Sequence, residues 1–103
     1  MLKHCVFLSL RSADEMATVE KAMQLLKGLV DKVDGMTGVS WGPNLDFENK
    51  SGAYQFGFIV TFRDRAAHLE YEKHPDHAEA GALLISACRG GYEGIFVVDL
   101  ETE

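Results

Sequence analysis

The segment AYQFGFIVTFR, residues 53–63, decides the fold class of this chain. Its aromatic and branched residues alternate with small or polar ones, a pattern typical of a half-buried β-strand. One face carries Tyr54, Phe56, Phe58, Val60 and Phe62, and the other carries Gln55, Gly57, Ile59 and Thr61. We therefore expect a strand over 53–63, the strongest strand signal in the chain.

Two helices are predicted directly after this strand. Asp64 is a good N-cap for a helix that runs to about Lys73. Pro75 interrupts that helix, because a residue before proline, here His74, is pushed out of the helical region. Proline is well placed as the first residue of a new helix, so a second one is expected from Pro75 to about Arg89.

The rest of the chain supplies one more helix and three more strands. Residues 2–10 alternate, with His4, Val6 and Leu8 on one face, and they predict the first strand. Ser12 to Glu15 has the spacing of a capping box before an apolar stripe at helical steps, for which Gly35 is a plausible stop. Strands are expected over 36–42 and 92–100, with a polar loop at 43–52.

The order βαββ(αα)β predicts one α+β domain over 1–103, a ferredoxin-like subunit with a four-stranded antiparallel sheet. Helices would cover one face of this sheet. The alternation assigns apolar side chains to the other face as well, namely Cys5, Phe7, Ile59, Ile95 and Val97. Monomers avoid an exposed patch of this kind. We therefore expect a homodimer through sheet-to-sheet packing.

Composition excludes several classes of function. The 103 residues carry a formal net charge of −6, so phosphate backbones would repel the chain and nucleic acid is not an expected partner. No apolar run approaches the roughly 20 residues that span a bilayer, and no secretory signal pattern is seen, so no membrane partner is expected. Two cysteines, Cys5 and Cys88, are too few for a disulfide scaffold. A soluble, cytoplasmic protein is the expectation.

Several motifs resemble those of one known family. They are K-H-x-V-x-L-x-L at residues 3–10, W-G-P-N at 41–44, F-R-D-R-A-A at 62–67, Y-E-K-H-P-D-H at 71–77 and I-F-V-V-D-L at 95–100. Together they span essentially the whole chain, and Y-x-x-H-P-x-H is the most specific. The chain resembles the stress-responsive dimeric α/β-barrel family, usually called Dabb. The resemblance implies a subunit whose sheet pairs with that of a second subunit to close a barrel.

The resemblance also implies candidate site residues. Many members of the family have no assigned activity, but one branch, the plant olivetolic acid cyclase, closes a linear polyketide by aldol condensation without a cofactor. Its catalytic tyrosine and histidine match Tyr71 and His77 here, and His4 matches a histidine that lines the same pocket. No cofactor is expected on this basis.

The chemistry of these side chains fits such a pocket. A neutral imidazole at His77 can take a proton from a carbon next to a carbonyl, and the Tyr71 phenol can stabilise the resulting oxyanion. His4 and His77 both fall on apolar faces and are expected to meet above the sheet, under the break at His74. We take His77 and Tyr71 as candidate catalytic residues.

Three further residues are candidate ligand contacts, namely His4, His74 and Trp41. Each has a plain structural alternative. His4 would serve as a hydrogen-bonded core histidine, His74 as the cap of the following helix, and Trp41 as a dimer contact. His68 lies among exposed charges on its helix, and we expect it to face solvent.

Other chemistries are not supported. His4, His74 and His77 have no metal-binding spacing, so no metal site is expected. Cys5 falls opposite His4, which disfavours a Cys-His nucleophile. Three hypotheses remain: a small apolar or aromatic molecule bound between helices and sheet, a cofactor-free enzyme of the cyclase or monooxygenase kind using the His/Tyr pair, and a structural, stress-protective oligomer. The sequence identifies no substrate, because apolar walls specify size more than chemical class.

Overall fold

The computed structural model describes all residues, 1–103, and confirms the predicted order of elements. Four strands and three α-helices make up the chain, with short 3-10 turns at several joints. In chain order the elements are β1 (Leu2–Leu8), η1 (Ala13–Glu15), α1 (Met16–Gly28), η2 (Leu29–Asp31), β2 (Met36–Pro43), β3 (Phe56–Phe62), α2 (Arg65–Lys73), α3 (Pro75–Ala87), η3 (Gly91–Gly94) and β4 (Ile95–Glu101). The chain is a ferredoxin-like α+β subunit, as the alternation predicted.

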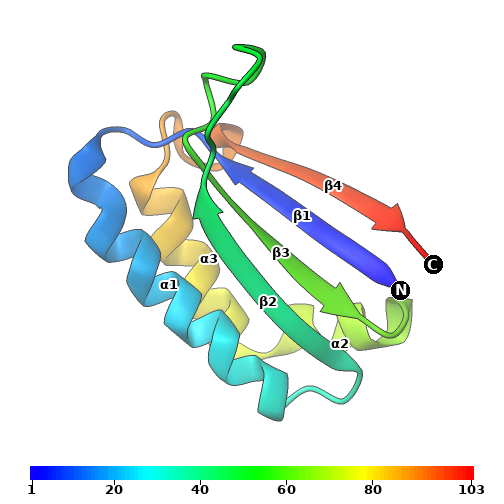
Figure 1. Ribbon diagram of the computed structural model, residues 1–103. Coiled ribbons are helices and arrows are strands. Elements are labelled where there is room, and N and C mark those ends of the chain that lie inside the picture. Colours follow the sequence, from blue (N-terminus) through cyan, green and yellow to red (C-terminus); the bar gives the residue numbers. More distant parts are fainter.

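The four strands form one antiparallel sheet in the order β2-β3-β1-β4. Figure 1 shows that the helices all lie on one side of this sheet and that the opposite side is left bare. The termini meet at one end of the sheet, where the Thr102 amide donates a 2.8 Å hydrogen bond to the Met1 carbonyl. The first and last strands are therefore neighbours, and residues nearly a hundred positions apart come together.

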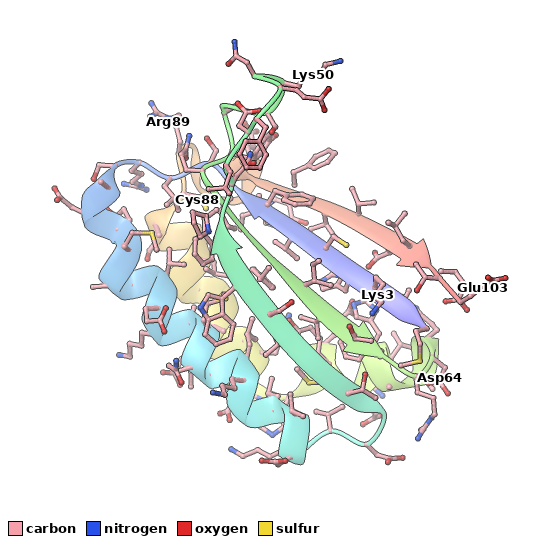
Figure 2. All side chains as sticks on the ribbon, viewed as in Figure 1. Lys3, Lys50, Asp64, Cys88, Arg89 and Glu103 are labelled. Atoms are coloured by element: carbon pink, nitrogen blue, oxygen red, sulfur yellow. The ribbon has the colours of Figure 1, made fainter.

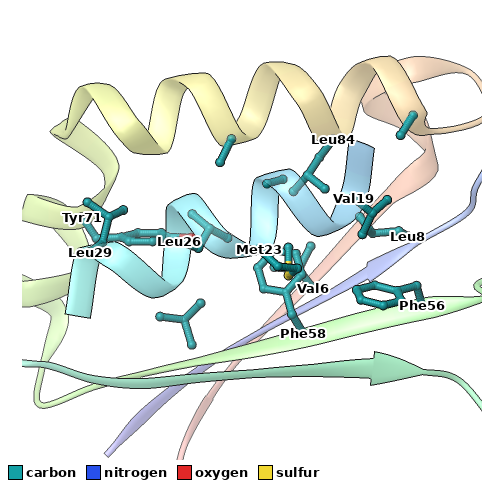
Figure 3. Packing of buried hydrophobic residues seen from close by; sticks show 14 of the residues in the cluster. Val6, Leu8, Val19, Met23, Leu26, Leu29, Phe56, Phe58, Tyr71 and Leu84 are labelled. Carbon is teal, nitrogen blue, oxygen red and sulfur yellow. The ribbon is translucent and has the colours of Figure 1, made fainter. Parts of the chain in front are cut away.

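The core fills the space between the helices and the covered face of the sheet. Val6, Leu8, Phe58 and Val60 point from the central strands toward the helices, and all are buried. Figure 3 shows Tyr71 at one end of this core beside Leu29 and Leu26, whereas Phe56 lies at the other end. Tyr71 is thus part of the packing and reaches the core from α2.

The helix boundaries follow from their caps. The Asp64 carboxylate accepts a 2.9 Å hydrogen bond from the Ala67 amide and begins α2. His74 has an extended backbone and ends α2, and its ring nitrogen accepts a 3.0 Å hydrogen bond from the Asp76 amide to begin α3. Both helix starts and the break before Pro75 agree with the sequence predictions.

Several predicted boundaries are wrong in detail. The Ser12 side chain bonds the Asp14 amide at 3.2 Å, so a 3-10 turn precedes α1 instead of a capping box with Glu15. Strand β3 begins three residues later than predicted, because the side chain of Gln55 bonds the Leu10 amide and the carbonyl of Gly52 and holds 53–55 in the loop. Strand β4 likewise begins at Ile95, after the turn η3.

The register of β4 corrects one predicted face of the sheet. Ile95 and Val97 pair with Leu8 and Val6, so they lie on the covered side and not on the bare side as predicted. Their neighbours occupy the bare face in their place: Phe96, Val98 and Leu100. The bare face also carries Cys5, Phe7 and Ile59, as predicted, and it remains strongly apolar.

A long loop between β2 and β3 projects beyond one end of the sheet, with Lys50 near its tip (Figure 2). The Asp46 carboxylate organises it by accepting hydrogen bonds from the amides of Lys50 and Ser51 at 2.8 and 2.9 Å. These bonds lower the pKa of Asp46. Among the helices, none is both long and apolar enough to cross a bilayer.

Candidate functional site

Five rings from four elements gather at one end of the space between helices and sheet. They are His4 on β1, Phe62 on β3, His68 and Tyr71 on α2, and His77 on α3. We call these five residues the ring cluster. His4 and Tyr71 have ring centroids 6.1 Å apart, and Tyr71 and His77 are 4.5 Å apart. The structure therefore brings together His4, Tyr71 and His77, three of the five predicted site residues.

Tyr71 lies at the centre of the ring cluster and is 1% exposed. Its ring makes edge-to-face contacts with Phe62 at 5.1 Å and with His77 at 4.5 Å. Burial raises the pKa of the Tyr71 phenol, and the nearby Glu72 carboxylate adds to this effect. The phenol is therefore fully protonated at neutral pH and can donate a hydrogen bond.

His77 is half-buried on α3, with its ring against Tyr71. Desolvation lowers the pKa of His77, and the proximity of His4 adds to this, although Glu72 opposes it. A lowered pKa makes the neutral imidazole the main form at pH 7. His77 is thus set up to accept a proton beside a phenol that keeps its own.

His4 points from β1 into the ring cluster and is held from the neighbouring strand. Its Nδ1 lies 2.6 Å from Oδ1 of Asp99, which pairs with His4 across β1 and β4. A carboxylate oxygen accepts hydrogen bonds, so Nδ1 of His4 is the donor in this contact.

His68 is buried, which contradicts the prediction that it faces solvent. The residue is 3% exposed, and its ring lies 4.7 Å from that of His4 and 5.2 Å from that of Phe62. Its Nδ1 lies 2.6 Å from a guanidinium nitrogen of Arg65, which can only donate. Burial lowers the pKa of His68, and the proximity of His4 lowers it further.

The other two predicted site residues lie outside the ring cluster. His74 uses Nδ1 to cap α3, which is the structural alternative named for it. Trp41 lies on the edge strand β2, where it pairs with Phe58 and packs partly buried against the core. None of the ring contacts of the cluster involves either residue.

A hollow of about 630 Å³ lies on the bare face of the sheet, not under the helices. Phe7, Ile59 and Phe96 line its floor, and Tyr54 lies 5.7 Å from Phe96 at its loop end. Of the predicted site residues, only Trp41 lines this hollow. Its floor is the same apolar surface from which the dimer was predicted.

His68 and Asp99 are the site residues that sequence reasoning missed. The sequence does indicate that His68 lies near Tyr71. The two residues are three positions apart, and residues at this spacing share a helical face. Asp99 had a weaker signal in the alternation that sets Val97 and Asp99 on one face of β4. Only the pairing of β4 with β1 shows that this face is the one that carries His4.

Comparisons with known proteins agree on the family and the fold of this chain. The model of the family described as "Stress responsive A/B Barrel Domain" (Dabb) matches residues 2–102. The stress-response A/B barrel domain-containing protein HS1 of Arabidopsis thaliana is 29% identical over 101 residues, which are 95% of this chain and 86% of that protein.

Two solved structures show the same fold. A dimeric ferredoxin-like protein of unknown function from Jannaschia sp. CCS1 superposes with a TM-score of 0.94 at 44% identity, and the match covers 98% of both chains. A hydroxynitrile lyase from Passiflora edulis superposes with a TM-score of 0.75 at 20% identity, covering 96% of this chain and 90% of that one. At that identity the likeness to the lyase concerns the fold alone.

Proposed function

The chain belongs to the stress-responsive A/B barrel (Dabb) family, and from this premise we propose that it is a homodimer that binds a small, mostly apolar carbonyl compound at the ring cluster. The contact between Tyr71 and His77, with ring centroids 4.5 Å apart, carries the proposal. A protonated phenol and a neutral imidazole side by side offer one donor and one acceptor in apolar surroundings. A carbonyl compound with an acidic neighbouring carbon needs both.

The Tyr71 hydroxyl is the natural partner of the ligand oxygen. No hydrogen bond within the chain involves it, although the ring is buried. The fully buried side-chain polar atom that lacks a partner is Nε2 of His68, so the Tyr71 hydroxyl keeps some contact with solvent. A ligand carbonyl would accept its hydrogen bond in place of water. His4 and His77 are both partly exposed, so the ring cluster is not sealed from solvent.

Proton transfer is the candidate reaction. His77 would take a proton from the carbon next to the carbonyl, and Tyr71 would donate a hydrogen bond to the enolate oxygen that develops. His4, held by Asp99, would supply a second imidazole beside the ligand. This is the chemistry of a cofactor-free cyclase or a related enzyme.

The dimer half of the proposal rests on the bare face. Phe96 and Leu100 are each 50% exposed there, and Ile59 is 40% exposed. Packing two such faces would bury these side chains and close the hollow above them. The relative from Jannaschia, which shares 44% of its sequence with this chain, is itself dimeric.

A structural role is the competing candidate, and one observation favours it. The ring of Phe62 lies 5.1 Å from Tyr71 and 5.2 Å from His68, so it takes up space beside Tyr71 that a ligand would need. In that case the cluster is simply the polar end of the core. Ligand binding distinguishes the two candidates.

The test uses 4-hydroxyacetophenone, an aromatic ketone, as the probe. Amide chemical shifts of the labelled protein would be followed during titration, and exchange of the probe's methyl protons in D₂O would report enolisation. We expect shifts centred on residues 68–78 and faster exchange than in buffer. Tyr71→Phe should weaken binding, and His77→Gln should abolish the faster exchange.

His74→Asn is the matched control, because asparagine also caps a helix and His74 lies outside the ring cluster. It should bind and exchange like the wild type. Shifts centred on Phe7 and Phe96 would move the site to the hollow on the bare face and overturn the proposal. Absence of binding at millimolar probe would favour the structural role.

A further inference from the structure

Three groups that metal ions favour meet at the edge of the ring cluster. His4 on β1, His68 on α2 and Asp99 on β4 each offer one ligand atom, and these atoms all lie within 4.8 Å of one another. Two imidazoles and one carboxylate form a donor set typical of Zn²⁺ and of Fe²⁺. These three ligands differ from the group of histidines weighed as metal ligands from the sequence, which were His4, His74 and His77.

One of these three residues, His68, has a ring nitrogen that no group of the protein hydrogen-bonds. Its Nε2 is buried and has no hydrogen-bond partner. Oε1 of Glu72 lies 3.1 Å away, but it is not oriented for a hydrogen bond. A buried imidazole nitrogen without a partner is uncommon in proteins and calls for an explanation such as an ion.

A cation already occupies the other side of the same ring. The guanidinium of Arg65 lies 2.6 Å from Nδ1 of His68. Arg65 is exposed and begins α2, so its long side chain can leave without disturbing the core. If Nδ1 binds an ion, Arg65 is displaced directly. If Nε2 binds it, Nδ1 must carry the ring proton and can no longer accept from Arg65.

We propose that His4, His68 and Asp99 form a binding site for one divalent transition-metal ion of the Zn²⁺ class per chain, with Arg65 as a competing internal cation. Metal–ligand bonds of about 2.0–2.2 Å require neighbouring ligand atoms about 3–3.5 Å apart. The ligand atoms all lie within 4.8 Å of one another, so their largest separation needs to close by no more than about 1–2 Å on binding. Asp99 lies half-exposed on the edge strand β4 and has room to make that movement.

The metal site shares His4 and His68 with the ring cluster, but it uses neither Tyr71 nor His77. The rings of His68 and Tyr71 have centroids 6.0 Å apart, so the ion would lie beside the phenol without needing it as a ligand. Metal affinity and probe binding are measured separately, and either proposal can fail while the other stands.

The experiment measures metal binding by the full chain after treatment with EDTA and dialysis. Zn²⁺ would be titrated calorimetrically, and Co²⁺ would be followed by its visible absorption, which reports coordination geometry. We expect one ion per chain. His68→Gln and Asp99→Asn should each weaken binding about tenfold or more. Arg65→Gln should tighten binding, because it removes the competing cation.

His74→Gln is the control, since His74 is a histidine of the same region outside the proposed ligand set. It should leave the affinity unchanged. Circular dichroism of each variant checks that the fold is retained. Arg65 is exposed, so the Arg65→Gln variant leaves the core intact. It therefore tests the site even if His68→Gln unfolds. Equal affinities in all variants, or no stoichiometric binding in Arg65→Gln, would overturn the proposal.

Discussion

The ring of Tyr71 meets the ring of His77 edge to face, with centroids 4.5 Å apart, across the break between α2 and α3. In one continuous helix, residues six positions apart are separated by about 9 Å along the axis and point in different directions. The extended backbone of His74 and the new start at Pro75 remove that separation. The helix break is therefore what creates the contact between the two candidate catalytic residues.

Tyr71→Phe is expected to change the free energy of unfolding by less than about 1 kcal/mol, because no hydrogen bond of the chain involves the Tyr71 hydroxyl and this hydroxyl is not among the fully buried polar atoms without a partner. Tyr71→Ala should cost about 3–5 kcal/mol, since it leaves a cavity in the core. Urea unfolding at a fixed protein concentration measures both. A large loss in Tyr71→Phe would show that the hydroxyl is a structural group and not one reserved for a ligand.

The protein should lose stability as the pH falls from about 7 to about 5. Burial lowers the folded-state pKa of His68 and His77 below the value of about 6.5 expected in the unfolded chain. The unfolded chain then binds more protons below pH 6.5, so acid favours unfolding. Above about pH 7 these two residues contribute no pH dependence.

Unfolding in urea with EDTA at several pH values checks this expectation. The double variant His68→Gln/His77→Gln should show a flatter profile between pH 7 and pH 5. Asp46 and Asp64, whose pKa values are lowered, matter only at more acidic pH. An equally steep profile in the double variant would contradict the assignment to these histidines.

Ile59→Asp should convert a dimer into a monomer, because it places a carboxylate in the middle of the bare sheet face. Sedimentation velocity at micromolar concentration measures the change. Leu69→Asp is a matched control, since Leu69 on α2 is 39% exposed against 40% for Ile59. A wild-type protein that sediments as a monomer would refute the argument from the bare face.

Gly57→Ala should destabilise the fold by about 1–3 kcal/mol, because an added Cβ would lie 2.9 Å from the ring of Phe7. Gly38→Ala on the same face should be nearly neutral, since nothing lies within 4 Å of its Cβ position. Both are best measured in the Ile59→Asp background, where no partner subunit contributes. If both variants lost the same free energy of unfolding, the close approach of Phe7 to Gly57 would not explain the effect.

Much of the fold could be predicted because it depends on local patterns. The alternation in 53–63 gave β3 apart from its first residues, and the break at Pro75 follows from the geometry of proline alone. Strand ends were less accurate, since side chains such as Gln55 compete for backbone groups over long distances. The motif Y-x-x-H-P-x-H placed Tyr71 and His77 together in advance.

The remaining part of the candidate site depends on tertiary register. His68 looked exposed because its neighbours in sequence are charged, yet α2 turns it toward His4 and Phe62. Asp99 could not be assigned, because alternation defines two faces of a strand without saying which one is covered. That choice also reversed the predicted faces of Ile95 and Val97.

The sequence by itself determined which segments are strands and helices, that the sheet would be apolar on both faces, and which family the chain resembles. Periodicity and backbone stereochemistry act over a few residues, so they can be read from the chain directly. The tertiary structure alone decided that β4 pairs with β1 so that Asp99 meets His4, and that Arg65 lies against His68. Such contacts join residues that share no local pattern, and only the packing of the helices on the sheet brings them within bonding distance.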